Sequence, residues 1–297
     1  MSQPRVGVIG GSGLYAVKEL ERLEERSLTT PFGDPSDAVL IGRWQGVTVA
    51  FLPRHGRGHR IMPSHINARA NIFALKCLGV EWLISVSAVG SMREDLAPGH
   101  VVIPDQFFDR TTSRPCTFFQ DGIAAHISFA DPVCAELSTI MHAAAIRAGA
   151  RVHLGGTYLC IEGPQFSTKA ESRIYRQWGV DVIGMTNLPE AKLAREAEMS
   201  YATLACVTDY DCWHETEEQV SVEVIGKTLQ QNAAMAQRII GEALPHIPVE
   251  RGSLYRDALK GAIITDPGAI PPHTKRNLAP LIGKYIPSET ATAVEPS

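Results

Sequence analysis

The chain has 297 residues, of which 44% are hydrophobic, so it is long enough to bury a sizeable core. Its formal net charge of −4 argues against an extended nucleic-acid surface, because proteins grip phosphate backbones with summed positive charge. No uninterrupted apolar stretch approaches the roughly 20 residues that a membrane-spanning helix needs. We therefore expect a protein that acts neither on nucleic acid nor in a membrane.

The six cysteines are scattered without C-x-x-C pairs, which is unlike a disulfide scaffold or a zinc ribbon. Residues 1–5 lack the charged and apolar regions of a signal peptide. Both features favour a cytoplasmic protein with reduced cysteines. Cys212 and His214 are two candidate metal ligands without a second pair, so no metal site is expected.

Short apolar runs recur along the chain and predict buried strands. They are Val6 to Ile9, Val47 to Leu52, Trp82 to Val86, His100 to Ile103, Tyr158 to Ile161, Val180 to Ile183 and Tyr201 to Val207. Segments with helical periodicity lie between several of them. They are Ser64 to Leu78, Asp131 to Ala148, Thr168 to Trp178, Pro189 to Met199 and Val222 to Ala243. This alternation predicts an α/β fold with a mixed, largely parallel sheet flanked by helices.

The composition changes after about Pro245. Residues 266–272 are rich in proline and glycine and must be irregular, whereas Thr274 to Ile286 can form a short helix. We therefore expect a single catalytic domain over residues 1–245 and a partly irregular C-terminal extension over residues 246–297.

The first predicted strand ends in Gly10-Gly11-Ser12-Gly13. Glycines let the backbone approach an anion closely, and Ser12 adds a hydroxyl donor. Residues 11–16 also fit the loose G-x-G-x-x-A pattern of dinucleotide-binding folds. That pattern needs an acidic residue at the end of the next strand, where this chain has Arg54 and His55. A plain tight turn remains an alternative.

Residues 54–60 hold five basic or potentially basic side chains in seven positions. They follow the Val47 to Leu52 run, and open α/β sheets bind ligands at the carboxyl ends of their strands. We expect Arg54 to grip a phosphate with its planar guanidinium and His55 to donate from a ring nitrogen. A solvated loop is the alternative.

Two further strand ends carry polar or pocket-forming residues. Ser87 and Ala88 lie in a segment of small hydroxyl and glycine residues that ends the third strand. Glu162 and Met185, together with the aromatic ring of Phe166, can line a pocket for a flat heterocycle and a sugar, although a surface charge at Glu162 and a core filler at Met185 are the default interpretations.

Asp209 and Asp211 stand together where the last apolar run ends. If extended geometry continues, these alternate residues share one face. Two like charges so close need a shared proton, a cation or a ligand rich in N–H groups. A solvated turn is the alternative.

These segments resemble, in order along the chain, the methylthioadenosine phosphorylase branch of the trimeric purine nucleoside phosphorylases. The motifs that carry the resemblance are Gly10-Gly11-Ser12-Gly13-Leu14, Thr30-Pro31-Phe32-Gly33, Arg54-His55-Gly56-Arg57, Ile61-Met62-Pro63-Ser64, Asp105-Gln106-Phe107, Asp109-Arg110-Thr111-Thr112, Glu162-Gly163-Pro164, Met185-Thr186, Pro189-Glu190 and Thr208-Asp209-Tyr210-Asp211-Cys212-Trp213. The set spans about Val6 to Leu244.

The resemblance implies a single-domain nucleoside phosphorylase-type fold and phosphorolysis of 5'-methylthioadenosine to adenine and 5-methylthioribose 1-phosphate. It implies no metal or organic cofactor, inorganic phosphate being a co-substrate. The residues that it assigns to phosphate are Ser12, Arg54, His55, Ser87, Ala88 through its backbone, and Thr186. The catalytic residues that it implies are Asp209 and Asp211, which meet N7 and the amine of the base, together with His55.

The resemblance also assigns the remaining contacts with the nucleoside. Met185 is expected to pack against the ribose, Phe166 and Ser167 to border the base, and Val222 and Ile225 to wall the 5' substituent. His126 is expected to reach the sugar from a neighbouring subunit, which implies a homotrimer.

Three alternatives to this function remain at this point. The chain can be a sister phosphorylase that acts on other nucleosides, such as methylthioinosine or adenosine. It can be a noncatalytic nucleotide-binding module, which needs no phosphate dependence. A nicotinamide-dependent oxidoreductase rests only on the glycine-rich loop.

Overall fold

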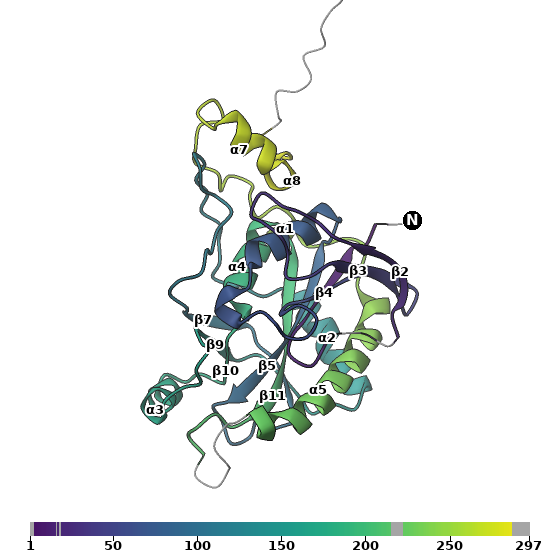
Figure 1. The fold of residues 1–297 in the computed structure, drawn as a ribbon, viewed down its shortest axis with the longest axis vertical. Coiled ribbons are helices and arrows are strands. Elements are labelled where there is room, and N and C mark those ends of the chain that lie inside the picture. The colour runs from purple at the N-terminus through teal and green to yellow at the C-terminus, as the bar shows by residue number, and fades with distance from the viewer. Residues whose placement is uncertain (1–2, 16, 18, 215–221, 287–297) are drawn as a thin grey trace, which may run out of the picture.

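The computed structural model describes residues 3–15, 17, 19–214 and 222–286, and a mixed sheet of eleven strands runs through its centre (Figure 1). The strands are β1 (Val6–Gly10), β2 (Glu21–Arg26), β3 (Val39–Trp44), β4 (Val47–Pro53), β5 (Trp82–Ser91), β6 (Val101–Ile103), β7 (Gln106–Arg110), β8 (Val152–Leu154), β9 (Thr157–Ile161), β10 (Val182–Gly184) and β11 (Ser200–Asp209). The helices are α1 (Ala68–Cys77), α2 (Ala135–Arg147), α3 (Lys169–Gln177), α4 (Asn187–Glu196), α5 (Val222–Ala243), α6 (Ser253–Arg256), α7 (Pro272–Asn277) and α8 (Ala279–Ile282).

The sheet has the order β2-β3-β4-β1-β5-β10-β9-β7, and β11 joins it by pairing with β5. The pairs β1–β4, β1–β5, β5–β11 and β9–β10 are parallel, whereas β2–β3, β3–β4 and β5–β10 are antiparallel. The expected mixed, largely parallel sheet flanked by helices is therefore confirmed. Because β4, β1, β5 and β11 are parallel neighbours, their carboxyl ends meet at one edge.

Helices cover both faces of the sheet, and alternate residues of a strand enter different cores. On β1, Val6 and Val8 pack in the cluster that includes α2 and α5, while Ile9 packs in the cluster that includes α1 and α4. Burial on both faces explains why the central strands read as nearly continuous apolar runs.

Two of the helices begin at capped residues. The Asn67 side chain accepts a hydrogen bond from the Ala70 N–H at the start of α1. Thr168 and Glu171 form a reciprocal capping box at the start of α3. The cap fixes the point at which the Phe166-Ser167 segment joins α3.

The C-terminal segment packs into the same core as the preceding chain. Leu259, Ile270, Leu278 and Ile282 all belong to the cluster that includes α1 and α4. Figure 1 shows α7 and α8 at one end of the molecule, whereas β5 and β11 run toward the opposite end, where α3 and the start of α5 lie. The proposed division at residue 245 stays a prediction.

The expected helix over Thr274 to Ile286 consists of two short helices, α7 and α8, since the backbone leaves the helical conformation between them. Among the described residues, no helix combines the length and the apolar character needed to span a bilayer.

Candidate active site

Polar residues that follow β1 and β4 lie beside Ser87, which is within β5. Gly10 of β1 pairs with Pro53 of β4, and Ile9 pairs with Ser85 of β5, so Ser12, Arg54 and Ser87 follow adjacent positions of the sheet. Thr186 arrives from β10, and its hydroxyl lies 3.3 Å from that of Ser87. The strand ends therefore gather the small donors that the sequence suggested.

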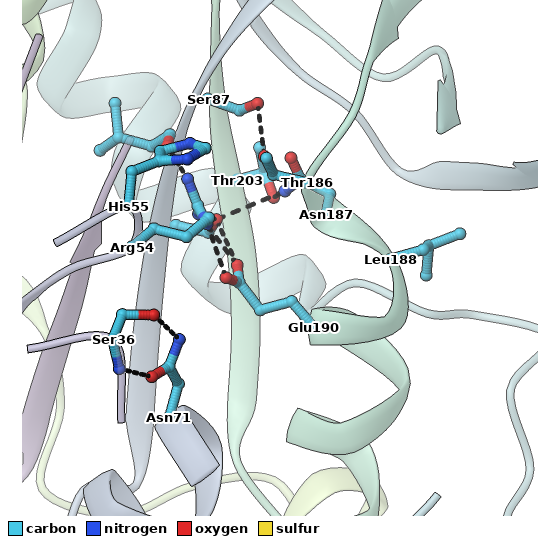
Figure 2. A network of polar contacts seen from close by, with 12 residues as sticks. Ser36, Arg54, His55, Asn71, Ser87, Thr186, Asn187, Leu188, Glu190 and Thr203 are labelled. Atoms are coloured by element: carbon cyan, nitrogen blue, oxygen red, sulfur yellow. Dashed lines mark hydrogen bonds and ion pairs between the residues drawn. The ribbon is translucent and has the colours of Figure 1, made fainter. Parts of the chain in front are cut away.

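Arg54 forms a buried ion pair with Glu190 of α4 (Figure 2). The guanidinium contacts the carboxylate through Nε at 2.8 Å and Nη2 at 3.1 Å, and both side chains are almost completely buried. Nη2 also donates to Ser85 Oγ, and Nη1 donates to the Val86 carbonyl at 2.8 Å. Glu190 therefore occupies the Nε–Nη2 edge of the guanidinium, and the expectation that Arg54 grips a phosphate stays a prediction.

One N–H of Arg54 Nη1 has no partner among the described residues, since the other four N–H groups are engaged. This atom lies beside Gly11: a Cβ at Gly11 would be 3.0 Å from Nη1 and 2.3 Å from the Val86 carbonyl oxygen. Burial by itself lowers the pKa of Arg54, but the charge and the hydrogen bonds of Glu190, with smaller contributions from Tyr201 and Tyr158, together outweigh burial and the pKa is raised. A positive group thus stands directly behind the glycine-rich loop.

His55 is buried and presents an acceptor at the site. Its Nδ1 lies 2.9 Å from the Ile61 carbonyl, which can only accept, so Nδ1 carries the proton of the neutral ring. Burial and then the Arg54 charge lower the pKa of His55 to about 4. Nε2 is consequently unprotonated near neutral pH, and the expectation that His55 donates to an anion is wrong for this state. In Figure 2 the ring lies on the side of Arg54 that faces Ser87 and Thr186, opposite Glu190.

One contact joins the basic loop to the glycine-rich loop, and a second lies within the basic loop. The His59 ring stacks on His55 with centroids 4.3 Å apart, and His59 Nδ1 lies 2.6 Å from the Tyr15 hydroxyl. The Tyr15–His59 bond connects the segments that follow β1 and β4. It stabilises the outer side of the residues suited to bind an anion, namely Ser12, Arg54, Ser87 and Thr186, which are called the anion cluster below.

Asp209 and Asp211 are close, but not for the reason that the sequence suggested. Asp209 ends β11, and Asp211 has a positive φ of 52°, so the extended conformation does not continue and the shared-face prediction is wrong. The turn brings the Asp211 N–H within 2.8 Å of Asp209 Oδ1. Burial raises the pKa of both carboxyl groups. The pair therefore favours holding a proton.

Ser167 and Met185 lie beside these two clusters. The Cys212 thiol, next to Asp211, donates to the Ser167 carbonyl at 3.2 Å, and Ser167 Oγ is buried without a hydrogen-bond partner among the described residues. Met185 Sδ occupies the space above Gly163, where a Cβ would be 2.6 Å away. Phe166 is 47% exposed and is free to cover a ligand.

The other expected site residues are less informative. Ala88 lies within β5, paired with Cys206. Val222 and Ile225 fall in the first turns of α5, and their side chains are outside the described part of the structure. His126 is exposed, and its N–H donates to the Ala262 carbonyl of the C-terminal segment at 2.9 Å. Within the described residues, His126 makes no hydrogen bond or ion pair with the residues at the strand ends.

Three residues near the site received no role from the sequence. Glu190 neutralises Arg54, and the Tyr158 hydroxyl lies 3.0 Å from that of Ser87. Arg114 donates to Met185 and Leu188 carbonyls and pairs with Glu162. The signal for Glu190 was Arg54 itself, because a buried arginine requires a negatively charged partner. Glu190 also stands in one of the motifs that carry the resemblance. Tyr158 and Arg114 gave no comparable signal.

The described residues contain no group of three or more His, Cys, Asp or Glu side chains placed to hold a metal ion. The arrangement offers instead a cluster of groups suited to an anion and a carboxyl pair whose pKa values burial raises, along one edge of the sheet.

Comparison with known proteins connects this geometry to one family. The model of the family described as the phosphorylase superfamily matches residues 5–245. An S-methyl-5'-thioadenosine phosphorylase from Geobacter sulfurreducens is 58% identical over 95% of this chain and 99% of the relative. One from Chloroflexus aurantiacus is 58% identical over 96% and 99%.

Solved structures agree in fold. The crystal structure of a methylthioadenosine phosphorylase from an Antarctic soil metagenomic library has a TM-score of 0.89 and 50% identity, covering 94% of this chain and 98% of that one. A variant adenosine/methylthioadenosine phosphorylase from Schistosoma mansoni, solved with methylthioadenosine, has a TM-score of 0.81 and 36% identity, covering 87% and 96%.

Proposed function

Because this chain belongs to the phosphorylase superfamily, we propose that it cleaves S-methyl-5'-thioadenosine with inorganic phosphate, giving adenine and 5-methylthioribose 1-phosphate. The relatives named for this reaction reach 58% identity over nearly the whole chain. The structural observation that carries the proposal is the carboxyl pair of the partly buried Asp209 and the buried Asp211, both with raised pKa values, at the sheet edge that also bears Ser12, Arg54, Ser87 and Thr186.

In this proposal the phosphate is held by Ser12, Ser87, the Ala88 backbone, Thr186, His55 and the remaining N–H of Arg54. Hydrogenphosphate carries one P–OH group, and the unprotonated Nε2 of His55 is suited to accept from it. The hydroxyl groups and Arg54 Nη1 then donate to the other oxygens. No metal or organic cofactor takes part.

The purine occupies the other half of the site. As the glycosidic bond breaks, positive charge grows on the sugar and negative charge on the base. The phosphate dianion stabilises the first, and a proton that Asp209 gives to N7 stabilises the second. Asp211 accepts from the amine at C6. Met185 packs on the ribose, while Phe166 and Ser167 border the base.

The Asp211 carboxylate, which faces C6 of the purine in this proposal, also predicts which base is preferred. Adenine presents an N–H donor there, whereas a 6-oxopurine presents an acceptor and leaves the carboxylate unpaired. We expect methylthioadenosine to be cleaved faster than methylthioinosine. A preference for the inosine analogue would identify a sister phosphorylase instead.

The decisive measurement is adenine release from methylthioadenosine with and without phosphate. Phosphate-dependent release supports the proposal, and binding without turnover supports a noncatalytic nucleotide-binding module. Asp209→Asn removes the transferable proton, and we expect turnover to fall by about 100-fold or more. Turnover near that of the wild type in this variant contradicts the role of Asp209.

The assembly is part of the same proposal. We infer a cytoplasmic homotrimer in which His126, together with Val222 and Ile225, surrounds the 5' end of the sugar. Sedimentation of the purified protein tests the trimer. His126→Ala should raise the KM for methylthioadenosine in the trimer, and a KM equal to that of the wild type would remove His126 from the site.

A further inference from the structure

The Thr208 hydroxyl stands between two acceptors beside the carboxyl pair. Its Oγ1 lies 2.6 Å from Asp209 Oδ2 and 3.1 Å from the Val89 carbonyl oxygen. The side chain is buried at the end of β11, where the pairing register with β5 shifts between Val207 and Asp209. The irregular register turns the Thr208 side chain toward the neighbouring strand.

A hydroxyl has one proton, so Thr208 can donate to only one of these oxygens at a time. When Asp209 is ionised, Thr208 donates to Oδ2. When Oδ2 carries the acid proton and directs it to N7 of the base, the neutral oxygen accepts more weakly and the Thr208 proton turns to the Val89 carbonyl. Both protonation states of Asp209 are then satisfied without movement of a heavy atom.

We propose that Thr208 is a positioning residue whose hydroxyl proton switches between Val89 and Asp209 as Asp209 gives up its proton. This inference rests on the proposed function, in which Asp209 protonates the leaving base. In that step the O–H bond of Asp209 breaks, the N7–H bond forms, and the electron pair of the glycosidic bond moves to the purine. The Thr208 bond to Oδ2 becomes charge-assisted at that moment and stabilises the new carboxylate.

Among the groups that face Asp209, Thr208 is the hydrogen-bond donor that can change its acceptor. Asp211 is the ionisable group that acts on Asp209, and its charge opposes ionisation. The Asp211 N–H donates to Oδ1, but a backbone donor cannot turn away. Cys212 and, on α3, Tyr175 act on Asp211; burial raises the pKa of both, so they stay neutral near neutral pH.

The matched variants are Thr208→Val, which keeps the shape without the hydroxyl, and Thr208→Ser, which keeps the hydroxyl. We expect Thr208→Val to lower kcat by about 10- to 100-fold, the size of a lost hydrogen bond to a charged group, with little change in the KM for methylthioadenosine. Thr208→Ser should remain within about threefold of the wild type, because its hydroxyl makes both bonds.

The pH profile separates this role from a structural one. Without the Thr208 donor the carboxylate of Asp209 is less stable, so its pKa rises and the alkaline limb of kcat/KM moves to higher pH. Loss of packing alone lowers the rate or the melting temperature and leaves the limb in place. An unmoved limb in Thr208→Val, or an equal loss in Thr208→Ser, overturns the inference.

A measurement without substrate keeps the two proposals apart. The carboxyl ¹³C resonance of Asp209, assigned by its absence in Asp209→Asn, reports the titration directly. A higher midpoint in Thr208→Val than in the wild type supports the inference even if the wild type releases no adenine, an outcome that would defeat the proposed function alone. Equal midpoints overturn the inference whatever the activity.

Discussion

Gly90 provides the space in which the Asp209 carboxyl lies. A Cβ at Gly90 would be 2.9 Å from Asp209 Oδ1 and 3.1 Å from Ile183 Cγ2, and it would also touch Asp211. Neither neighbour can retreat easily, because Oδ1 is bonded to the Asp211 backbone and Ile183 is buried. The absence of a side chain on β5 therefore helps to set the geometry on β11.

We predict that Gly90→Ala lowers kcat by at least about 10-fold, since the methyl group displaces the carboxyl by a fraction of an ångström from the reacting base. Steady-state kinetics measures the effect. Gly99→Ala is not a suitable control because Gly99 has a positive φ, whereas Gly252 has open space and φ outside the left-handed region. Gly252→Ala should leave kcat unchanged; an unchanged kcat in Gly90→Ala would contradict this account.

The sequence predicted which residues gather at the site better than it predicted what they do there. Strand ends locate Ser12 and Asp209 because parallel neighbours end at one edge, whereas Ser87 lies within β5. His55 was misjudged and the ion pair of Arg54 was missed, because their partners, the Ile61 carbonyl and Glu190, come from segments whose approach no local pattern reveals. The turn at Asp211 likewise depends on a positive φ that aspartate adopts only occasionally.

At the level of elements, α4 joins the sheet edge to the core through two buried glutamates. Glu190 accepts from Arg54, Ser85 and Tyr201, so its charge is fully paired. Glu196, at the end of the same helix, accepts from the Phe118 N–H and the Thr117 hydroxyl and from no other group of the described residues. Helix α4 thus carries one glutamate, Glu190, whose charged form is stabilised by an ion pair, and another, Glu196, whose neutral form is favoured by burial.

We predict that Glu190→Gln destabilises the protein by about 3–5 kcal/mol, because the buried Arg54 charge loses its partner. Urea unfolding measures the loss. The control is Glu25→Gln, which breaks the exposed ion pair with Arg57 and should cost at most about 1 kcal/mol. Equal losses in the two variants would show that burial of the Arg54 pair is unimportant.

Glu196 makes stability depend on pH. Burial raises the pKa of Glu196 from 4.5 to about 7. Since the folded value is the higher one, its contribution to stability is fully present below about pH 4.5 and is lost as the pH rises to about 7. The shift corresponds to about 3 kcal/mol.

We therefore expect Glu196→Gln to be more stable than the wild type at pH 8 and to lose this advantage at pH 5. Its amide oxygen can accept from Phe118 while the amide nitrogen donates to Thr117. Urea titrations at both pH values check the difference, with the exposed Glu94→Gln as control. A difference that is the same at pH 5 and pH 8 would contradict it.

The strands that the sequence revealed are largely buried, but burial did not ensure detection, since the buried β3 was missed as well as the exposed β2. The expected runs at Val6 and Val47 became β1 and β4 within one residue, and the helix over Val222 to Ala243 has the bounds predicted. By contrast β2 was missed, because this edge strand is exposed and its sequence, ERLEER, has no apolar run. Its pairing with β3 is a long-range contact that local periodicity does not encode.

On the scale of the whole molecule, the C-terminal segment is bound by buried polar contacts as well as by its apolar side chains. Glu198, which is buried, accepts from the Leu259 N–H at 3.0 Å and from the Tyr285 hydroxyl at 2.5 Å. The Ile264 N–H donates to the Ala124 carbonyl, and Thr274 donates to the Asp121 carbonyl. The segment thereby also supports the loop that carries His126.

We predict that a chain ending at residue 250 is strongly destabilised, because it exposes the face of α1 and α4 and leaves Glu198 without its partners. Thermal unfolding and solubility measure the effect. A chain ending at Ile286 is the matched control, since it keeps every contact described for the segment. Equal melting temperatures of the 250-residue chain and the full chain would show instead that residues 1–245 are independent of the extension.

The two cores become complete at different times during synthesis. The buried cluster that includes α2 and α5 contains no described residue beyond Tyr255, whereas the one that includes α1 and α4 extends to Ile286. The N-terminal part leaves the ribosome first. One face of the sheet can therefore be buried while the other is still exposed, because Leu278, Leu281 and Ile282 have not yet been synthesised. During that interval the uncovered face is a binding surface for chaperones, and a stalled or truncated product remains a substrate for proteases.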